Sequence, residues 1–432
     1  MTATDGVPPE HDVADLCAGS AAHGATVRVA GHRVTEHRLR VPLDHADPDG
    51  EQLTVFAREV AADGGEDRPV LLFLQGGPGQ EAPRPTLTPP SPAWLERALR
   101  DHRVLLLDQR GTGLSSPVGT MAGLRPAEQA ERLALFRADA IVADAELLRA
   151  HLGLERWSVL GQSFGGFCAL HYLSAAPSSL QRVLFTGGLP PVGRSPDDVY
   201  ALTWVSMRER SRRFYERYPG DRDRMRALVD LAAAGRLRLA GGDAVGVERL
   251  RGLGAVLGMS DGAEVVHALL ERDPTSPAFR HDLAASLPFS GRAPLYAAVH
   301  EACYADGGST RWSARRTMPG DVADNPTLFF GEHVMPSSFA DPELAPLLEA
   351  AELLAERSWP RLYDADVLAS SDVACAAAIY ADDAYVPREL SEQTVALLPG
   401  MRPWVTGDLE HNGLRADGAR VLDRLLALTD RG

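Results

Sequence analysis

Cysteine is scarce in this chain, and its placement excludes two common kinds of domain. The 432 residues include four cysteines, Cys17, Cys168, Cys303 and Cys375, which lie far apart and form no CxxC pair. Neither a zinc site nor a disulfide framework is therefore expected. Cys168 stands in an apolar stretch, where we expect a small buried side chain.

Long apolar segments and a surplus of positive charge are also missing. No stretch has 18 consecutive apolar residues, so no membrane-spanning helix is predicted. Residues 1–10 lack the basic and then apolar pattern of a secretory leader, so we expect a cytoplasmic location. The net charge of −15 argues against a nucleic-acid partner, because phosphate binding needs a basic face.

The known phosphate-binding motifs are absent as well. Residues 108–115 read D-Q-R-G-T-G-L-S, and this spacing fits neither GxGxxG nor GxxxxGK[ST]. We therefore exclude a nucleotide site. We expect a structural loop that braces the edge of an active site, with Asp108 and Arg110 as a candidate ion pair.

The sequence does contain the pattern of a mixed α/β domain. Residues 33–41 and 53–57 are strand-like and flank Asp47-Pro48-Asp49-Gly50, a turn sequence, which predicts an antiparallel hairpin. The continuous apolar runs that follow are typical of strands covered on both faces. Helical stretches such as 138–152 separate these runs, so we predict a mostly parallel sheet with helices on both faces. The runs are 69–74, 104–107, 159–160 and 183–188.

From residue 190 to about residue 360 the sequence changes to a mostly helical pattern with few strand-like runs. Strand-like sequence resumes at 376–380 and 402–406, and a helix over 416–428 closes the chain. We therefore predict an insertion into the α/β core. The predicted parts are a core of residues 1–189 and 363–432 and a helical cap of residues 190–362.

One serine occupies a position suited to a nucleophile. Residues 161–166 read G-Q-S-F-G-G, after a strand-like segment at 157–160 and before an apolar, Ala-rich stretch at 164–176. A serine in such a strand-to-helix turn is presented to substrate, and flanking glycines give the crowded backbone room. We predict that Ser163 is the nucleophile.

A serine hydroxyl needs a base, and the base needs an orienting acid. On a sheet of this kind the acid and then the histidine follow the serine, each after a late strand. His411 follows the strand ending at Thr406 and precedes the last helix, so it is the predicted base. Asp382 and Asp383 both follow the strand ending at Tyr380, and only one can face His411 because adjacent side chains point apart.

A glycine-rich loop follows the first buried strand. Residues 75–79 read Q-G-G-P-G, and glycine lets backbone N–H groups approach a substrate oxygen closely. We predict that the N–H groups of Gly77 and Phe164 form the oxyanion hole.

In this order, the segments resemble the proline iminopeptidases (prolyl aminopeptidases) of the α/β-hydrolase superfamily. The long insertion, with H-E-A-C-Y at 300–304 and G-E-H at 331–333, is similar to the larger form of these enzymes. The resemblance implies an α/β-hydrolase core with a cap, and release of N-terminal proline from peptides without metal or cofactor. The segments that carry it are 75–79, 108–115, 161–166, 380–386 and 410–414.

The resemblance also assigns the acid and exposes two departures. In the family an aspartate followed by Met-Tyr-Val is catalytic, and Asp383 before Ala384-Tyr385-Val386 matches that pattern. Ala384 replaces the usual Met, which is expected to alter packing beside the acid. Gln75 replaces the usual His of the glycine loop; because the oxyanion donors are backbone groups, activity is expected to survive.

An aminopeptidase must hold a charged amine, and in the family cap glutamates do so. Glu301 and Glu332 are the candidates here, because each lies in an apolar neighbourhood and a buried amine needs a paired charge. Trp312 or Phe330 is expected to line the proline pocket. The expected partner is a peptide or small amide with a free N-terminus; no nucleic acid or membrane is expected, and a homo-oligomer is allowed.

Two other functions are compatible with the same residues. The fold does not fix the leaving group, so an esterase or amidase acting on a small secondary metabolite is the alternative. A hydrolase-like binding protein without catalysis is the third hypothesis. Such proteins normally lose a triad member, whereas Ser163, Asp383 and His411 are all present.

Overall fold

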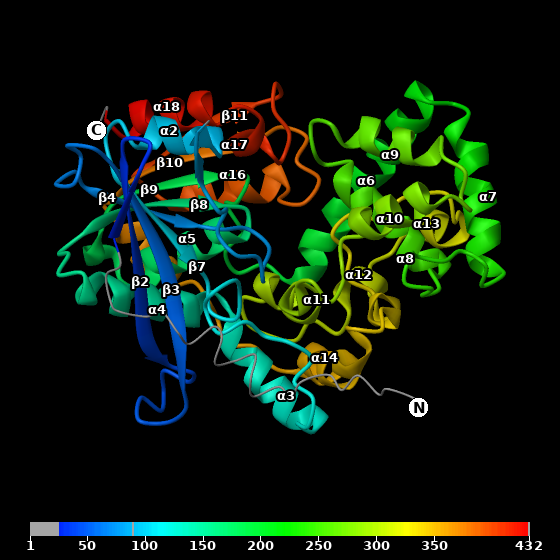
Figure 1. The fold of residues 1–432 in the computed structure, drawn as a ribbon, viewed down its shortest axis with the longest axis horizontal. Coiled ribbons are helices and arrows are strands. Elements are labelled where there is room, and N and C mark those ends of the chain that lie inside the picture. The colour runs from blue at the N-terminus through cyan, green and yellow to red at the C-terminus, as the bar shows by residue number, and fades with distance from the viewer. Residues whose placement is uncertain (1–25, 89, 431–432) are drawn as a thin grey trace, which may run out of the picture.

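The computed structural model describes residues 26–88 and 90–430. The predictions for Cys17, for the absence of a leader in residues 1–10 and for the first 25 residues of the core lie outside the described residues. Two parts are visible in Figure 1: a sheet with flanking helices, and a helical part beside it.

Nine strands form the main sheet, in the order β1-β2-β3-β7-β4-β8-β9-β10-β11. The strands from β7 to β11 pair in parallel, while β1, β2 and β3 are antiparallel at one edge. The predicted α/β architecture with a mostly parallel sheet is thereby confirmed. The strand bounds are β1 Thr26–Val29, β2 His32–Pro42, β3 Gln52–Ala62, β4 Val70–Leu74, β7 Arg103–Asp108, β8 Trp157–Gln162, β9 Leu180–Thr186, β10 Ala374–Tyr380 and β11 Met401–Thr406.

The strands of the main sheet form where the sequence predicts them, except for β1, which was not predicted. The hairpin of β2 and β3 is antiparallel, with Val41 opposite Leu53, as the turn sequence at 47–50 predicts. A second, small sheet of β5 (Thr86–Leu87) and β6 (Pro90–Ser91) was not predicted.

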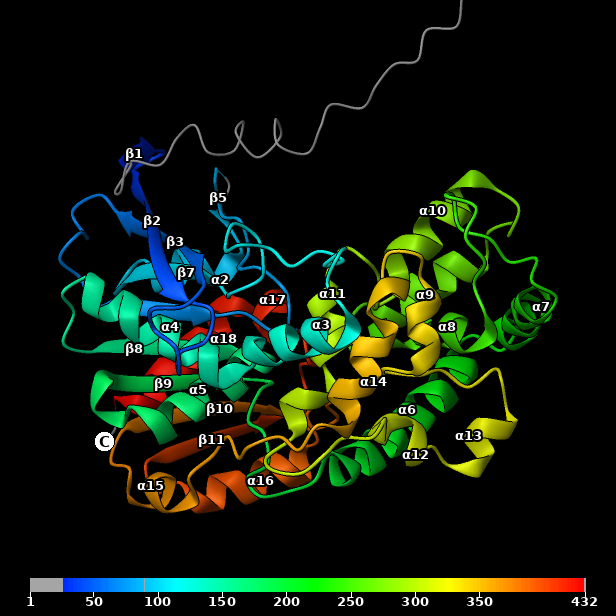
Figure 2. The ribbon, with the colours of Figure 1, turned by 90° about the horizontal axis from the view of Figure 1, so that it is seen from below.

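Side chains alternate between the two faces of the sheet, so each buried strand serves two cores. In β4, Leu71 and Phe73 pack into one core with α2 and α18, while Leu72 and Leu74 pack into the other core with α4 and α5. Figure 1 shows α2 and α18 above the sheet and α4 and α5 below it, and Figure 2 views the sheet from the α4 side. The helices are α2 Ala93–Ala98, α4 Ala138–His151, α5 Phe164–Ala175 and α18 Gly418–Thr429.

The closing helix predicted over 416–428 is α18, and a short helix that was not predicted, α17, precedes it. α17 (Gly413–Ala416) ends before Asp417, whose φ of −146° and ψ of 58° are not helical, and α18 begins at Gly418. A Cβ on Gly418 would lie 2.7 Å from Cβ of Trp94 in α2. The break therefore lies where the start of α18 packs closely against α2.

The chain between β9 and β10 is mostly helical, as predicted for 190–362. Figure 1 shows most of these helices, from α6 to α10 and α13, gathered beside the sheet, with α11, α12 and α14 next to them. Their bounds are α6 Pro196–Arg217, α7 Asp221–Ala233, α8 Val247–Arg251, α9 Gly262–Leu270, α10 Pro277–Ser286, α11 Pro294–Val299, α12 Ser313–Arg316, α13 Gly320–Asp324 and α14 Leu348–Glu356. The remaining helices are α3 Pro126–Leu133, α15 Ala365–Ser370 and α16 Arg388–Leu397.

The expected ion pair of Asp108 with Arg110 is wrong. Arg110 is buried and forms a bidentate pair with Asp144 of α4, at 2.7 and 2.6 Å. The carboxylate of Asp108 instead accepts hydrogen bonds from the N–H groups of Leu114 and Ala82, at 2.9 and 3.2 Å. A buried guanidinium needs several acceptors, and Asp144 together with the carbonyl oxygens of Pro42, Leu43 and Leu135 supplies them.

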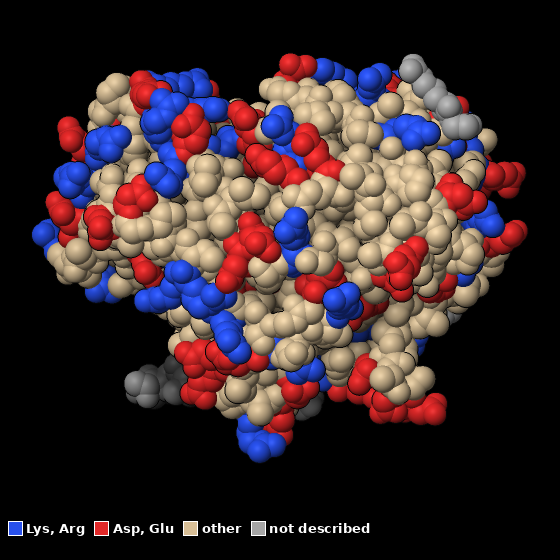
Figure 3. Space-filling view, turned by 180° about the vertical axis from the view of Figure 1, so that it is seen from behind, with Lys and Arg blue, Asp and Glu red and all other residues tan. Residues whose placement is uncertain are grey.

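The surface carries both signs of charge. On the face shown in Figure 3, acidic and basic side chains are interspersed, and the outline is indented between the two parts of the molecule. No helix in the described residues is both long and apolar enough to cross a membrane.

Candidate active site

Ser163 lies in the tight turn between β8 and α5. Its φ of 53° and ψ of −125° fall in a region that non-glycine residues rarely adopt. Such strain persists only where the surroundings fix the turn. The turn presents the side chain at the carboxyl end of the parallel strands, where open α/β sheets bind ligands.

Close backbone packing explains the glycines around Ser163. A Cβ on Gly165 would lie 1.9 Å from the carbonyl oxygen of Leu74, and one on Gly161 would lie 2.5 Å from that of Gly165. A Cβ on Gly188, in the segment after β9, would lie 2.3 Å from the carbonyl oxygen of Ser163. Larger residues at these positions would push β4, β8 and the turn apart.

Three predicted residues from distant parts of the chain form one hydrogen-bonded chain. His411 Nε2 lies 3.0 Å from Ser163 Oγ, and His411 Nδ1 lies 2.8 Å from Asp383 Oδ2. Because an ionised carboxylate only accepts, Nδ1 carries the proton and donates to Asp383, which leaves Nε2 free to accept from the serine hydroxyl. This arrangement can transfer the serine proton to the imidazole during attack on an acyl carbon.

The choice between the two adjacent aspartates follows from their surroundings. Asp383 is 4% exposed, and its Oδ1 also accepts from the N–H groups of Tyr385 and Val386, at 2.9 and 3.0 Å. Asp382 points to the surface, where it pairs with Arg213 at 2.9 Å. Only Asp383 therefore faces His411.

The electrostatic environment favours a charged imidazole. Burial by itself lowers the pKa of His411, but the charge of Asp383 and its hydrogen bond outweigh burial, so the pKa is raised above its ordinary value. The negative charge of Glu332 acts in the same direction. The ring of Tyr385 packs edge-on against the imidazole, with centroids 4.8 Å apart, which restricts its orientation.

The predicted oxyanion donors lie at the start of α5 and in the loop after β4. Phe164 is the first residue of α5, so its N–H has no acceptor in a preceding helical turn. Gly77 lies in the loop after β4 with a φ of 131°, which favours glycine. Its neighbour Gly76 approaches Ser163 closely, because a Cβ there would lie 2.9 Å from Cβ of Ser163. The sequence offered no basis for distinguishing the two glycines.

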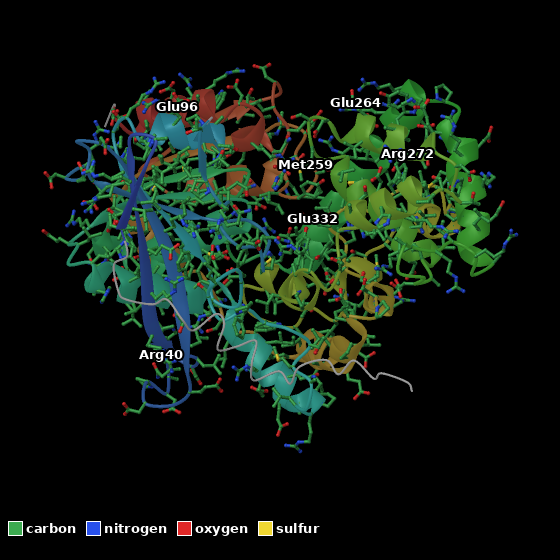
Figure 4. All side chains as sticks on the ribbon, in the orientation of Figure 1. Arg40, Glu96, Met259, Glu264, Arg272 and Glu332 are labelled. Carbon is green, nitrogen blue, oxygen red and sulfur yellow. The ribbon has the colours of Figure 1, made fainter. Side chains whose placement is uncertain are left out.

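Glu332 is brought into the electrostatic range of the triad. It is half-buried, and its Oε1 accepts a hydrogen bond of 2.6 Å from the hydroxyl of Tyr296. Burial raises the pKa of Glu332, while the charge of His411 opposes that shift. In Figure 4, Glu332 lies between the sheet-containing part and the helical part. A partly accessible carboxylate at this place can pair with a cationic group.

The other predicted ligand residues have different surroundings. Glu301 is 7% exposed and accepts hydrogen bonds from the N–H groups of Ser313 and Ala314, at 3.0 and 2.8 Å. Burial raises its pKa to about 7. The ring of Trp312 packs against Phe339, and Phe330 packs against Trp204 and His333. The partners in these contacts all lie within residues 190–362.

A loop of the helical part is fastened to the loop that carries His411, which the sequence did not predict. The N–H of His411 donates to the carbonyl oxygen of Gly258, at 3.2 Å. The N–H and hydroxyl of Ser260 both donate to Asn412 Oδ1, at 3.0 and 2.8 Å. Gly258 also donates to the Tyr385 hydroxyl at 3.0 Å, and a Cβ on Gly258 would lie 2.3 Å from that ring. The only signal in the sequence is the glycine itself.

The side chains of Ser163, His411 and Asp383 are of the types used in nucleophilic acyl transfer, whereas metal ligands and cysteines show no comparable grouping in the described residues. No three His, Cys, Asp or Glu side chains are grouped to hold a metal ion in the described part of the chain. The three cysteines within that part, Cys168, Cys303 and Cys375, are buried and unpaired.

The chain is similar in sequence to several known proteins. A family model of the α/β-hydrolase fold matches residues 69–238. A proline iminopeptidase of Aeromonas sobria is 42% identical over 413 residues, which cover 91% of this chain and 95% of that protein. One from Aspergillus aculeatus is 33% identical over 425 residues, covering 92% and 94%. The solved structure of proline iminopeptidase from Mycobacterium smegmatis is 16% identical, with a TM-score of 0.44, and the match covers 90% and 98% of the two chains.

Proposed function

This chain belongs to the proline iminopeptidase family of the α/β-hydrolases and is a hydrolytic aminopeptidase, and we propose that Ser163, His411 and Asp383 carry out its release of N-terminal proline. The observation that carries the proposal is the continuous hydrogen-bonded chain from Ser163 Oγ through His411 to Asp383. The 42% identity over 91% of the chain supports the substrate class.

The proposed reaction has two half-reactions. Ser163 Oγ attacks the prolyl carbonyl carbon while His411 Nε2 takes the hydroxyl proton, and Asp383 stabilises the resulting imidazolium. The carbon–nitrogen bond then breaks, and His411 gives its proton to the leaving amine. Water next attacks the prolyl ester with His411 as base, which releases proline and restores the serine hydroxyl. Gly77 and Phe164 are the proposed donors to the oxyanion, and Gly76 is close enough to Ser163 to contribute.

Recognition of the free amine is assigned to Glu332. A substrate with a protonated proline nitrogen needs an anionic partner near the nucleophile, and Glu332 is half-buried and interacts with the charges of His411 and Asp383. The hydroxyl of Tyr296 engages one oxygen of Glu332. Both oxygens of Glu301 accept hydrogen bonds from backbone N–H groups at the start of α12, which supports a capping role for that side chain.

The division of the chain is part of the same proposal. Residues up to 189 and from 363 form the proposed hydrolase core, and residues 190–362 form its cap. The hydrogen bonds of Gly258 and Ser260 to the His411 loop support a cap that helps to hold the catalytic histidine. A cytoplasmic location is proposed from the sequence, and cell fractionation tests it.

The substrate class is tested with four matched substrates. Initial rates are measured on proline p-nitroanilide, N-acetylproline p-nitroanilide, alanine p-nitroanilide and a p-nitrophenyl ester. Strong preference for proline p-nitroanilide over its N-acetyl form is expected, since acetylation removes the positive charge. Ester turnover without cleavage of the proline anilide would reject the aminopeptidase and favour an esterase.

A further inference from the structure

A recess adjoins the proposed site on the side of His411. It has a volume of about 170 Å³ and is lined by His411 together with residues of β4, α2, α17 and one loop of the helical part. Glu332 does not line it, so the recess is distinct from the proposed amine site. Its apolar walls are Phe73, Trp94, Met259 and Leu414.

The position of the recess relates it to the leaving group. His411 must give its proton to the departing amine, so the residue that follows the scissile bond has to lie beside the imidazole. The recess is bounded by His411 and by Gln162, the residue before the nucleophile. A substrate bound at Ser163 would therefore direct its second residue into this space.

The size and lining of the recess favour an apolar ring. A dry apolar cavity of about 150 Å³ in another protein accommodates benzene, so about 170 Å³ is enough for one aromatic side chain. Phe73 and Trp94 are 2% exposed and pack at a centroid distance of 4.6 Å, which gives the recess a fixed aromatic wall. Met259, which Figure 4 places between the sheet-containing part and the helical part, supplies an adaptable wall, and thioethers contact aromatic rings favourably.

A cation lies at the rim of the recess. Arg415, in α17, is exposed, and no acidic side chain within residues 26–88 and 90–430 forms an ion pair with it. In a chain with a net charge of −15, an arginine without an acidic partner next to an apolar recess is suited to the carboxylate of a short peptide. The amide side chains of Gln75 and Gln162 also line the recess and can bond the peptide backbone.

We infer that this recess binds the residue after the N-terminal proline, and that it selects an aromatic or large aliphatic side chain there. The inference rests on the proposed function. In a dipeptide substrate, the free carboxylate of that residue lies on Arg415.

The experiment compares kcat/KM for Pro-Phe-NH2, Pro-Gly-NH2 and the free acid Pro-Phe, following proline release. The wild-type enzyme is expected to prefer Pro-Phe-NH2 over Pro-Gly-NH2 by about tenfold or more, since burial of a phenyl side chain is worth at least one decade. Met259→Ala is expected to reduce that preference about threefold or more. Met318→Ala, at another half-buried methionine outside the recess, is the matched control and should leave the ratio unchanged.

The role of Arg415 is tested by comparing the free acid Pro-Phe with the amide Pro-Phe-NH2. Arg415→Gln should lower kcat/KM for Pro-Phe by about two- to fivefold, as expected for an exposed pair, and leave Pro-Phe-NH2 unchanged. Arg424→Gln, at an exposed arginine of α18, should change neither. Equal turnover of Pro-Phe-NH2 and Pro-Gly-NH2 would overturn the inference alone. Absence of turnover on every prolyl amide would overturn the proposed function and this inference with it.

Discussion

The variant Glu332→Gln, in which one carboxylate oxygen is replaced by an amide nitrogen, distinguishes an aminopeptidase from a general acyl hydrolase. The amide keeps the size of the carboxylate and can still accept from Tyr296, which donates to Oε1 at 2.6 Å. Only the negative charge is lost. A substrate with a protonated proline nitrogen should therefore bind more weakly to the variant in the ground state and in the transition state.

The magnitude follows from the burial of the site. Truncating one partner of a buried, hydrogen-bonded charge pair costs about 2–5 kcal/mol. Glu332 is half-buried, so the lower part of that range applies, since solvent screens a partly exposed charge. At 1.36 kcal/mol per decade, a loss of about 2–3 kcal/mol corresponds to a decrease of about 30- to 150-fold in kcat/KM.

The assay compares proline p-nitroanilide with cyclopentanecarboxylic acid p-nitroanilide, in which carbon replaces the ring nitrogen. Glu332→Gln should lower kcat/KM for the first substrate and leave the second unchanged or faster. Glu301→Gln is the matched control, because the Glu301 oxygens accept from the N–H groups of Ser313 and Ala314; its effect should be below about threefold. Circular dichroism checks that both variants are folded.

Two results would refute this reasoning. An equal loss on both substrates would mean that Glu332 supports the structure of the site and does not bind the amine. A large loss in Glu301→Gln together with an unchanged Glu332→Gln would assign the amine to the other carboxylate.

Three further predictions follow from the electrostatics and the contacts of the site. Because the pKa of His411 is raised, the midpoint of the acid limb of the kcat/KM profile should lie above pH 6.5. Below that midpoint, kcat/KM should fall about tenfold per pH unit. A midpoint below pH 6 would contradict this prediction. Because the pKa of Glu301 is about 7 and thus raised, the folded protein retains a proton that the unfolded chain loses between about pH 4.5 and 7. The stability that this proton contributes, up to about 3 kcal/mol, is present below pH 4.5 and is lost as the pH rises through 7. In urea unfolding, Glu301→Gln should therefore gain stability relative to the wild type between pH 5 and 8. A difference in stability that stays constant with pH would contradict this prediction. Asn412→Ala should lose about 1 kcal/mol of stability, and its kcat should fall several-fold. The control Asn325→Ala removes a similar acceptor of N–H and hydroxyl groups remote from the triad and should lose stability alone. Equal kcat values for the two variants would show that the cap loop does not position His411.

The parts of the fold that the sequence predicts are those set by local patterns. Alternating and continuous apolar runs gave the hairpin and the parallel strands, because side-chain period and burial determine a strand within a few residues. The turn at Ser163 was predictable for the same reason. Its glycines are required by contacts between adjacent elements, such as a Cβ at Gly165 that would lie 1.9 Å from a strand carbonyl.

The contacts that were missed join residues distant in the sequence. Arg110 pairs with Asp144 and not with Asp108, because the fold brings α4 beside the loop. Asn412 binds a loop 152 residues earlier in the chain. No periodicity or motif encodes such pairings, since they depend on how the inserted helices pack on the sheet.

The central claim is that Ser163 is the nucleophile that releases N-terminal proline. Its most direct test is to measure kcat/KM for proline p-nitroanilide with the wild-type enzyme and with Ser163→Ala. On the same day, the active site of the wild type is titrated with a fluorophosphonate. The wild type is expected to show robust turnover and labelling at Ser163, and the variant is expected to lose activity by at least about 10⁴-fold. A variant that retains activity within tenfold, or a wild-type enzyme that turns over substrate without labelling at Ser163, would contradict the claim.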